Sequence, residues 1–138
     1  MSTLDPAHPR RREPWLLRST LLVGMLLVAV GTIVVLNHVL HGPLPFDRER
    51  WDAEVNDTDD ETRHRMADGL INSNALLGKR RADIVALLGE PPATNYFREF
   101  DLVYWLGLER GWIRLDSEWL VMRLDANGRV TEAGIVTD

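Results

Sequence analysis

The sequence predicts an α+β protein, in which an N-terminal transmembrane helix precedes two helices and an antiparallel sheet of three or four strands. Three observations support this fold class. Residues 19–46 contain no Asp, Glu, Lys or Arg. Apolar residues then recur at helical spacing between residues 66 and 88, and after Pro92 the spacing changes to the two-residue alternation of strands. Because the helices precede the strands, α+β is expected rather than α/β.

The apolar segment 21–36 lies inside an uncharged run that is long enough to cross a bilayer as a helix, at about 1.5 Å per residue. Arginines precede this segment at positions 10, 11, 12 and 18, and the next basic residue is Arg48. Basic residues favour the cytoplasmic side. We therefore expect a single-pass protein of the cytoplasmic (inner) membrane, with its N-terminus inside and its C-terminal domain outside.

A cleaved secretory signal is the alternative, because a basic region and an apolar region are both present. The small residues Ala29 and Gly31 have the spacing that a signal peptidase reads, but they lie inside the apolar run. The polar end of the run, residues 37–41, lacks this pattern. An uncleaved signal anchor is therefore the expectation.

The chain is expected to contain four parts. They are a cytoplasmic tail over residues 1–14, the signal anchor over 15–40, a linker over 41–56 and one extracytoplasmic domain over 57–138. Trp51 in the linker has two interpretations: it anchors at the lipid headgroups, or it packs on the folded domain. From His41 onward, 12 Lys and Arg stand against 19 Asp and Glu, and this acidic balance argues against nucleic acid as a partner.

Two helices are expected at the start of the domain. The acidic residues 57–61 precede a helix whose apolar face holds Met66, Ala67, Leu70 and Ile71. A calcium-binding loop is the other reading of these acids, but the required glycine and closing glutamate are missing. A second helix over 79–88 ends at Gly89, where a left-handed residue stops it before Pro91 and Pro92.

Strands are expected over residues 95–100, 102–106 and 119–124, where apolar and β-branched or aromatic residues alternate. Residues 125–128 (Asp-Ala-Asn-Gly) are typical of a tight turn, and residues 129–136 return as the last strand of a hairpin.

Several short motifs in this order resemble the SmpA/OmlA (BamE-like) domain family. They are Gly78, the helix end 83–91, residues 104–107 and the strand, turn and strand of 120–130. The resemblance covers residues 70–136 and implies two helices on a three-stranded antiparallel sheet. It also implies an envelope accessory that binds proteins and carries no catalytic residues or cofactor. The outer-membrane members are attached through a lipid-bearing cysteine, whereas this chain has no cysteine.

Residues able to carry chemistry are few. His38 and His41 are three apart on the span and have no cysteine beside them, so interfacial polar capping is favoured over metal binding. Glu99, Asp101 and Ser117 support the alternative function, a small extracytoplasmic ligand-sensing or hydrolase-like domain. No metal or cofactor site is expected.

The segment 107–116 is the leading candidate for a binding site, because it is longer than a tight turn and places apolar residues between charges. Leu108, Trp112 and Ile113 are the predicted partner contacts. The other interpretation is an extra strand with Trp112 on the sheet or in the core. The expected function is a non-enzymatic, membrane-anchored module that binds another envelope protein.

Overall fold

The structure is a computed structural model that describes residues 14–53, 61–111 and 113–138, with side chains from Arg18 onward. Its chain divides into two units, Met1–His41 and Gly42–Asp138.

The first unit contains helix α1 (Pro14–His41). Its part Arg18–His41 is long and apolar enough to cross a membrane, either as an anchor or as a signal sequence. The side chains of this part are exposed, and the Thr32 hydroxyl donates a hydrogen bond to the carbonyl of Val28 at 2.9 Å. A hydroxyl bonded within its own helix can enter lipid at little cost. The prediction of an N-terminal apolar helix is confirmed.

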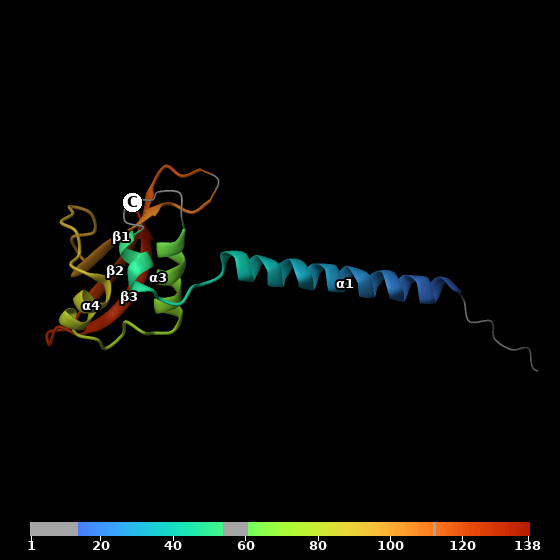
Figure 1. The fold of residues 1–138 in the computed structure, drawn as a ribbon, viewed down its shortest axis with the longest axis horizontal. Helices are drawn as coiled ribbons and strands as arrows, with labels where there is room; N and C mark the ends of the chain where they lie inside the picture. Colours follow the sequence, from blue (N-terminus) through green and yellow to red (C-terminus); the bar gives the residue numbers. More distant parts are fainter. Residues whose placement is uncertain (1–13, 54–60, 112) are drawn as a thin grey trace, which may run out of the picture. The chain divides into compact units, whose positions relative to one another are not determined.

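The second unit is α+β, as predicted. Three helices come first: α2 (Arg48–Ala53), α3 (Thr62–Asn72) and α4 (Arg81–Leu88). Three strands follow: β1 (Leu102–Leu108), β2 (Ser117–Leu124) and β3 (Val130–Thr137). Each strand pairs antiparallel with the next, which gives one sheet in the order β1-β2-β3 (Figure 1).

The sheet is covered on both faces because successive strand residues point to opposite sides. One face packs against the helices and forms the main core, to which β1 and β2 contribute Leu102, Tyr104, Leu106, Leu120 and Met122, and α3 and α4 contribute Met66, Ala67, Leu70, Ile84 and Leu88. The other face buries Val103, Trp119 and Val121 beneath Phe97 and Phe100.

Residues 95–100 form turns, so the prediction of a strand there was wrong. Phe97 has a φ of 50°, and the amide of Phe100 donates to the carbonyl of Phe97 at 3.0 Å. The apolar alternation has another cause, because Phe97 and Phe100 cover the helix-free face of the sheet from a loop. The described sheet therefore has three strands.

The segment expected to be a linker, 41–56, differs from that expectation over residues 42–53, which belong to the folded unit. Trp51 on α2 is 1% exposed, and its indole Nε1 donates to the carbonyl of Leu88 at 3.1 Å. Leu44 and Phe46 pack against the same core. Of the two interpretations of Trp51, packing on the domain is therefore correct. The Gly and Pro residues of this segment interrupt regular structure without preventing burial.

The segment that leads into α2 lies directly against α3. The amide of Leu44 donates to the carbonyl of Arg65 at 2.8 Å, and the Arg65 guanidinium donates to the carbonyl of Gly42 at 2.7 Å. A Cβ atom at Gly69 would lie 2.2 Å from the Leu44 oxygen. Only glycine allows this close approach between the extended segment and the helix.

Two local signals in the sequence are confirmed. Gly89 ends α4 with a φ of 88°, and its amide donates to the carbonyl of Val85 at 2.8 Å. In the β2–β3 turn, Asp125 Oδ1 accepts from the amides of Asn127 and Arg129 at 2.8 and 2.9 Å. At the start of α3, Glu61 is the N-cap residue without a side-chain capping bond, and residues 57–60 lie outside the described part.

The contact at Gly69 predicts that a glycine-to-alanine change in this helix destabilises the protein, the opposite of the usual effect. Glycine to alanine in a helix ordinarily stabilises by about 0.5–1 kcal/mol. Gly69→Ala should instead lower the free energy of unfolding by about 1–3 kcal/mol, because the added methyl group collides with the Leu44 carbonyl. Denaturant unfolding of the full chain in detergent measures this, with Asn72→Ala on the exposed face of α3 as the control. A stabilised Gly69→Ala variant would contradict the contact.

Candidate partner-binding loop

The connection between β1 and β2, residues 109–116, forms an extended hairpin loop. Leu108 pairs with Ser117 at the end of the two strands, and the amide of Glu109 donates to the carbonyl of Asp116 at 2.8 Å. Gly111 has a φ of 134°, a conformation that favours glycine. The strand pairing thus continues one step into the loop before the chain turns.

Apolar side chains are exposed on this loop. Ile113 is 66% exposed and Leu115 is 82% exposed. Leu108 is half-buried at the end of β1, and Trp112 lies outside the described residues. Of the predicted partner contacts, Ile113 therefore lies on the surface and Leu108 at its margin. Leu115 is a second exposed apolar side chain on this loop, besides the residues predicted as contacts.

The base of the loop is held by a cluster of charged side chains. The Arg110 guanidinium lies 2.8 Å from Glu118 on β2 and 2.5 Å from Asp68 on α3. The Arg110 amide also donates to Glu118 Oε1 at 3.1 Å. This cluster, called the Arg110 clamp below, links the loop to the strand and to the helix. Bonds of this type between charged groups are about twice as strong as neutral ones.

Glu118 is the most buried member of the Arg110 clamp, with 7% of the residue exposed. Burial acts to raise the pKa of its carboxyl group. The hydrogen bonds and the positive charge of Arg110 outweigh that effect, so the pKa of Glu118 is lowered. The carboxylate therefore stays charged at neutral pH and keeps Arg110 in place.

His64 on α3 is fully buried, and its ring lies against Gly107 on β1. A Cβ atom at Gly107 would be 2.7 Å from the imidazole Cε1, so glycine on β1 makes room for the ring. A bulge in β1 between Trp105 and Gly107 accompanies this contact. Among the described residues, neither ring nitrogen of His64 has a hydrogen-bond partner.

The surroundings of His64 favour its neutral form. Burial lowers the pKa of the imidazole below its ordinary value of 6.5, and the charge of Arg110 acts in the same direction. The carboxylates of Glu118, Glu61 and Asp68 oppose this shift without reversing it. Protonation of His64 is therefore linked to the packing of α3 against the base of the loop.

The residues considered for a hydrolase-like site do not converge. Asp101 Oδ2 accepts from the amide of Leu124, whereas Ser117 begins β2, so the two residues lie about 20 Å apart along that strand. The Glu99 carbonyl accepts from Arg123 at 2.6 Å, beside Asp101. Nucleophilic catalysis needs a nucleophile and a base within hydrogen-bond reach. Ser117 cannot form such a pair with Asp101.

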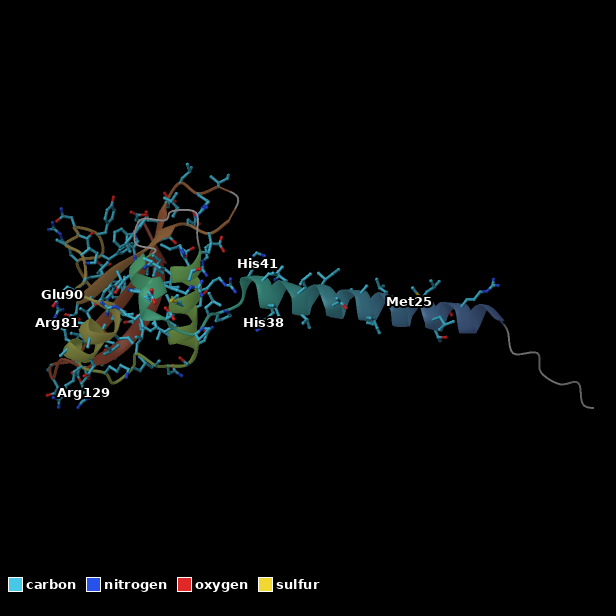
Figure 2. The ribbon with its side chains drawn as sticks, in the orientation of Figure 1. Met25, His38, His41, Arg81, Glu90 and Arg129 are labelled. Carbon is cyan, nitrogen blue, oxygen red and sulfur yellow. The ribbon has the colours of Figure 1, made fainter. Side chains whose placement is uncertain are left out.

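No group of three metal-ligating side chains occurs among the described residues. His38 and His41 lie near the C-terminal end of α1 (Figure 2). The acids of the considered calcium loop, residues 57–60, lie outside the described part.

A cavity of about 290 Å³ opens where α2, the end of α4 and β1 meet. Its walls include Trp51, Tyr104 and Trp105, and Glu90 at its margin is labelled in Figure 2. The Tyr104 hydroxyl donates to the carbonyl of Gly89 at 2.8 Å, and burial raises the pKa of Tyr104 to about 12. The polar atoms of Trp51 and Tyr104 bind backbone carbonyls, so these two residues present ring surfaces, while Asp52, Arg63 and Glu90 add charged groups to the lining.

Sequence reasoning did not find the Arg110 clamp or the burial of His64. His64 is one turn from Ala67 and Asp68, so its place on the apolar side of the helix was visible in the spacing. The pairing of Arg110 with Asp68 spans 42 positions and has no local signal.

No family model, curated protein or solved structure matches this chain.

Titration of His64 gives a prediction about pH. Its pKa is lower in the folded than in the unfolded state, so only the unfolded state takes up the proton between the two values. The stability contribution is complete above about pH 6.5 and is lost as the pH falls through the folded pKa, by at most about 1.4 kcal/mol per pH unit.

His64→Leu should flatten the dependence of the free energy of unfolding on pH between 7 and 5. Denaturant titrations of the full chain at each pH measure the slope. An equal slope in the wild-type and His64→Leu proteins would show that His64 titrates alike in both states.

Proposed function

We propose that the protein is a membrane-anchored, extracytoplasmic binding module that holds another envelope protein at the loop 109–116. The observation that supports this proposal is the exposure of Ile113 and Leu115 on a loop whose base is fixed by the Arg110 clamp. A few residues in the desolvated centre of an interface supply most of its binding energy, and exposed apolar side chains can be buried there.

The Arg110 clamp favours binding because it reduces the entropy cost of association. A loop held at both strands and at α3 loses less freedom when a partner covers its tip. The loop contributes exposed apolar surface, and the side chains of Ile113 and Leu115 are not needed to bury the core. A binding loop needs exposed side chains that can contact a partner without being required for folding.

The membrane assignment rests on the sequence and on the length of α1. Four arginines precede the apolar segment, and positive charge favours the cytoplasmic side. The second unit carries the acidic excess of the chain, which disfavours nucleic acid as a partner. The resemblance to SmpA/OmlA domains supports the same function, a non-enzymatic envelope accessory without a cofactor.

The aromatic cavity supports a second candidate function, the sensing of a small ligand. Its volume of about 290 Å³ is close to the lower end of the range for ligand sites. Trp51, Tyr104 and Trp105 would offer ring faces to an apolar or aromatic group. The polar atoms of Trp51 and Tyr104 already bind backbone carbonyls and do not orient a ligand, which makes this candidate the weaker one.

The proposed topology predicts the location of the C-terminus. A reporter enzyme that is active only outside the cytoplasm should be active when fused after Asp138, and replacing the four arginines at positions 10, 11, 12 and 18 with Glu should reduce its activity. An N-terminal tag should remain on the mature protein after carbonate washing of the membranes. Activity of a cytoplasm-only reporter at the same position would rule out the topology, and loss of the tag would show a cleaved signal.

The proposed binding site predicts where a partner cross-links. A photoreactive amino acid at Leu115 of the full chain should capture one defined envelope protein in cells, whereas the same group at Asn127, on the β2–β3 turn, should not. Ile113→Glu should reduce the Leu115 cross-link because a carboxylate would enter an apolar contact.

The Ile113→Glu variant should unfold at the wild-type denaturant concentration, since the side chain is exposed. Equal cross-linking from Leu115 and Asn127, or no effect of Ile113→Glu, would reject this loop as the site. Arg110→Met tests the Arg110 clamp. Unlike Ile113→Glu, it should weaken the cross-link and also lower the free energy of unfolding by about 1–3 kcal/mol.

A further inference from the structure

Strand β3 has an open edge. Its first residue is covered, because the amide of Gly78 donates to the carbonyl of Val130 at 2.8 Å and the amide of Val130 donates to the carbonyl of Lys79 at 2.9 Å. Beyond Val130, no other described segment pairs with β3 on the side away from β2. The edge from Thr131 to Thr137 is therefore available for strand pairing.

The register shows which backbone groups face outward. The carbonyl of Ser117 accepts from the amide of Asp138, so these residues form a hydrogen-bonded pair with β3. Alternation along an antiparallel ladder then directs residues 132, 134 and 136 toward β2. The amide and carbonyl groups of Ala133, Ile135 and Thr137 point to the open side.

Apart from a bulge at Thr131, where β3 shifts register against β2, this edge lacks the features that usually prevent strand addition. Proteins protect such edges with lysine, proline or inward-pointing charges. From Val130 to Thr137, β3 has no proline and no basic residue. Its one charge, Glu132, pairs with Arg123 on β2 at 3.1 Å. The strand is thus a nearly neutral strip on an acidic domain.

Neither crowding nor backbone conformation within the fold requires a glycine at position 134, in the middle of this edge. Gly69 and Gly107 each make room for a neighbouring group, at Leu44 and His64. A Cβ atom at Gly134 would meet nothing within 4 Å, and its φ does not require glycine. Glycine inside a strand often marks a place where another backbone approaches closely.

We propose that β3 pairs with β3 of a second copy of this chain, antiparallel and with the two-fold axis at Gly134. The regular part of the open edge, residues 132–136, is centred on Gly134, so this register uses its full length. It places Ala133 opposite Ile135 and Glu132 opposite Val136. No like charges face each other, and a small side chain meets a large one at each Ala–Ile pair.

A second copy fits this edge better than an unrelated strand because the sequence is complementary to itself in this register. Each small Ala133 meets the larger Ile135 of the other copy on both sides of the axis, within the regular part of the edge. The two sheets then form one six-stranded sheet, from two sheets of three strands. The loop 109–116 joins β1 and β2 and takes no part in this pairing.

Disulfide trapping tests the register, since the chain has no cysteine of its own. At the two-fold axis, Gly134 faces Gly134 in a non-hydrogen-bonded pair, with about 4.5 Å between the Cα atoms. That distance is within the range of a disulfide. Gly134→Cys in the full chain, oxidised in native membranes, should form a covalent dimer, and Asn127→Cys on the turn should not.

Glu132→Cys and Val136→Cys should cross-link to each other when co-expressed, and neither should cross-link strongly to itself. Dimers of Gly134→Cys at the level of Asn127→Cys would overturn the proposal. So would a disulfide between Gly134→Cys and a different protein, which would identify a foreign strand as the occupant.

Gly134→Lys provides a test without cross-linking. It places two positive charges opposite each other at the axis, and the open space above Gly134 lets the monomer fold. Light scattering of the full chain in detergent should show a dimer for the wild-type protein and a monomer for Gly134→Lys. The unfolding temperature should depend on protein concentration for the wild type and not for the variant. A monomeric wild-type protein, or a dimer that persists in Gly134→Lys, would refute the β3 interface.

Discussion

The structure depends on covering a three-stranded sheet on both faces. A sheet of this size cannot exclude water from its own side chains, because each strand directs residues to both sides. The helices cover one face, and a loop with Phe97 and Phe100 covers the other. This need for cover explains why Trp51, far from the sheet in sequence, packs against the end of α4. It also explains why residues 42–53 belong to the fold.

Local signals predicted most of the fold. The apolar run of α1, the glycine stop of α4 and the Asp125 turn each depend on neighbouring residues, and each was visible in the sequence. The segments 42–53 and 95–100 were not, because their structure is decided by burial against distant elements. Phe97 and Phe100 are three residues apart, a spacing that would direct them to opposite faces of a strand, whereas the loop packs both rings against one face of the sheet.

The candidate site was predicted in part. The apolar residues between charges in 107–116 indicated an exposed loop, and Ile113 is exposed there. The Arg110 clamp and the space at Gly107 are contacts between α3 and the hairpin, so no pattern within the loop encodes them. The His64 ring contacts the space at Gly107, and the charges of Arg110 and Glu118 act on its pKa.

The close approach of Leu44 to Gly69 has a mechanical consequence. The amide and carbonyl groups of residues 42–44 are bonded to Arg65 on α3, so tension applied at Gly42 reaches that helix first. From α3 the load can pass to the sheet directly, because α3 packs against β1 and its Asp68 is paired with Arg110. When the domain is pulled at Gly42, residues 42–44 should therefore separate from α3 before the strands separate from one another.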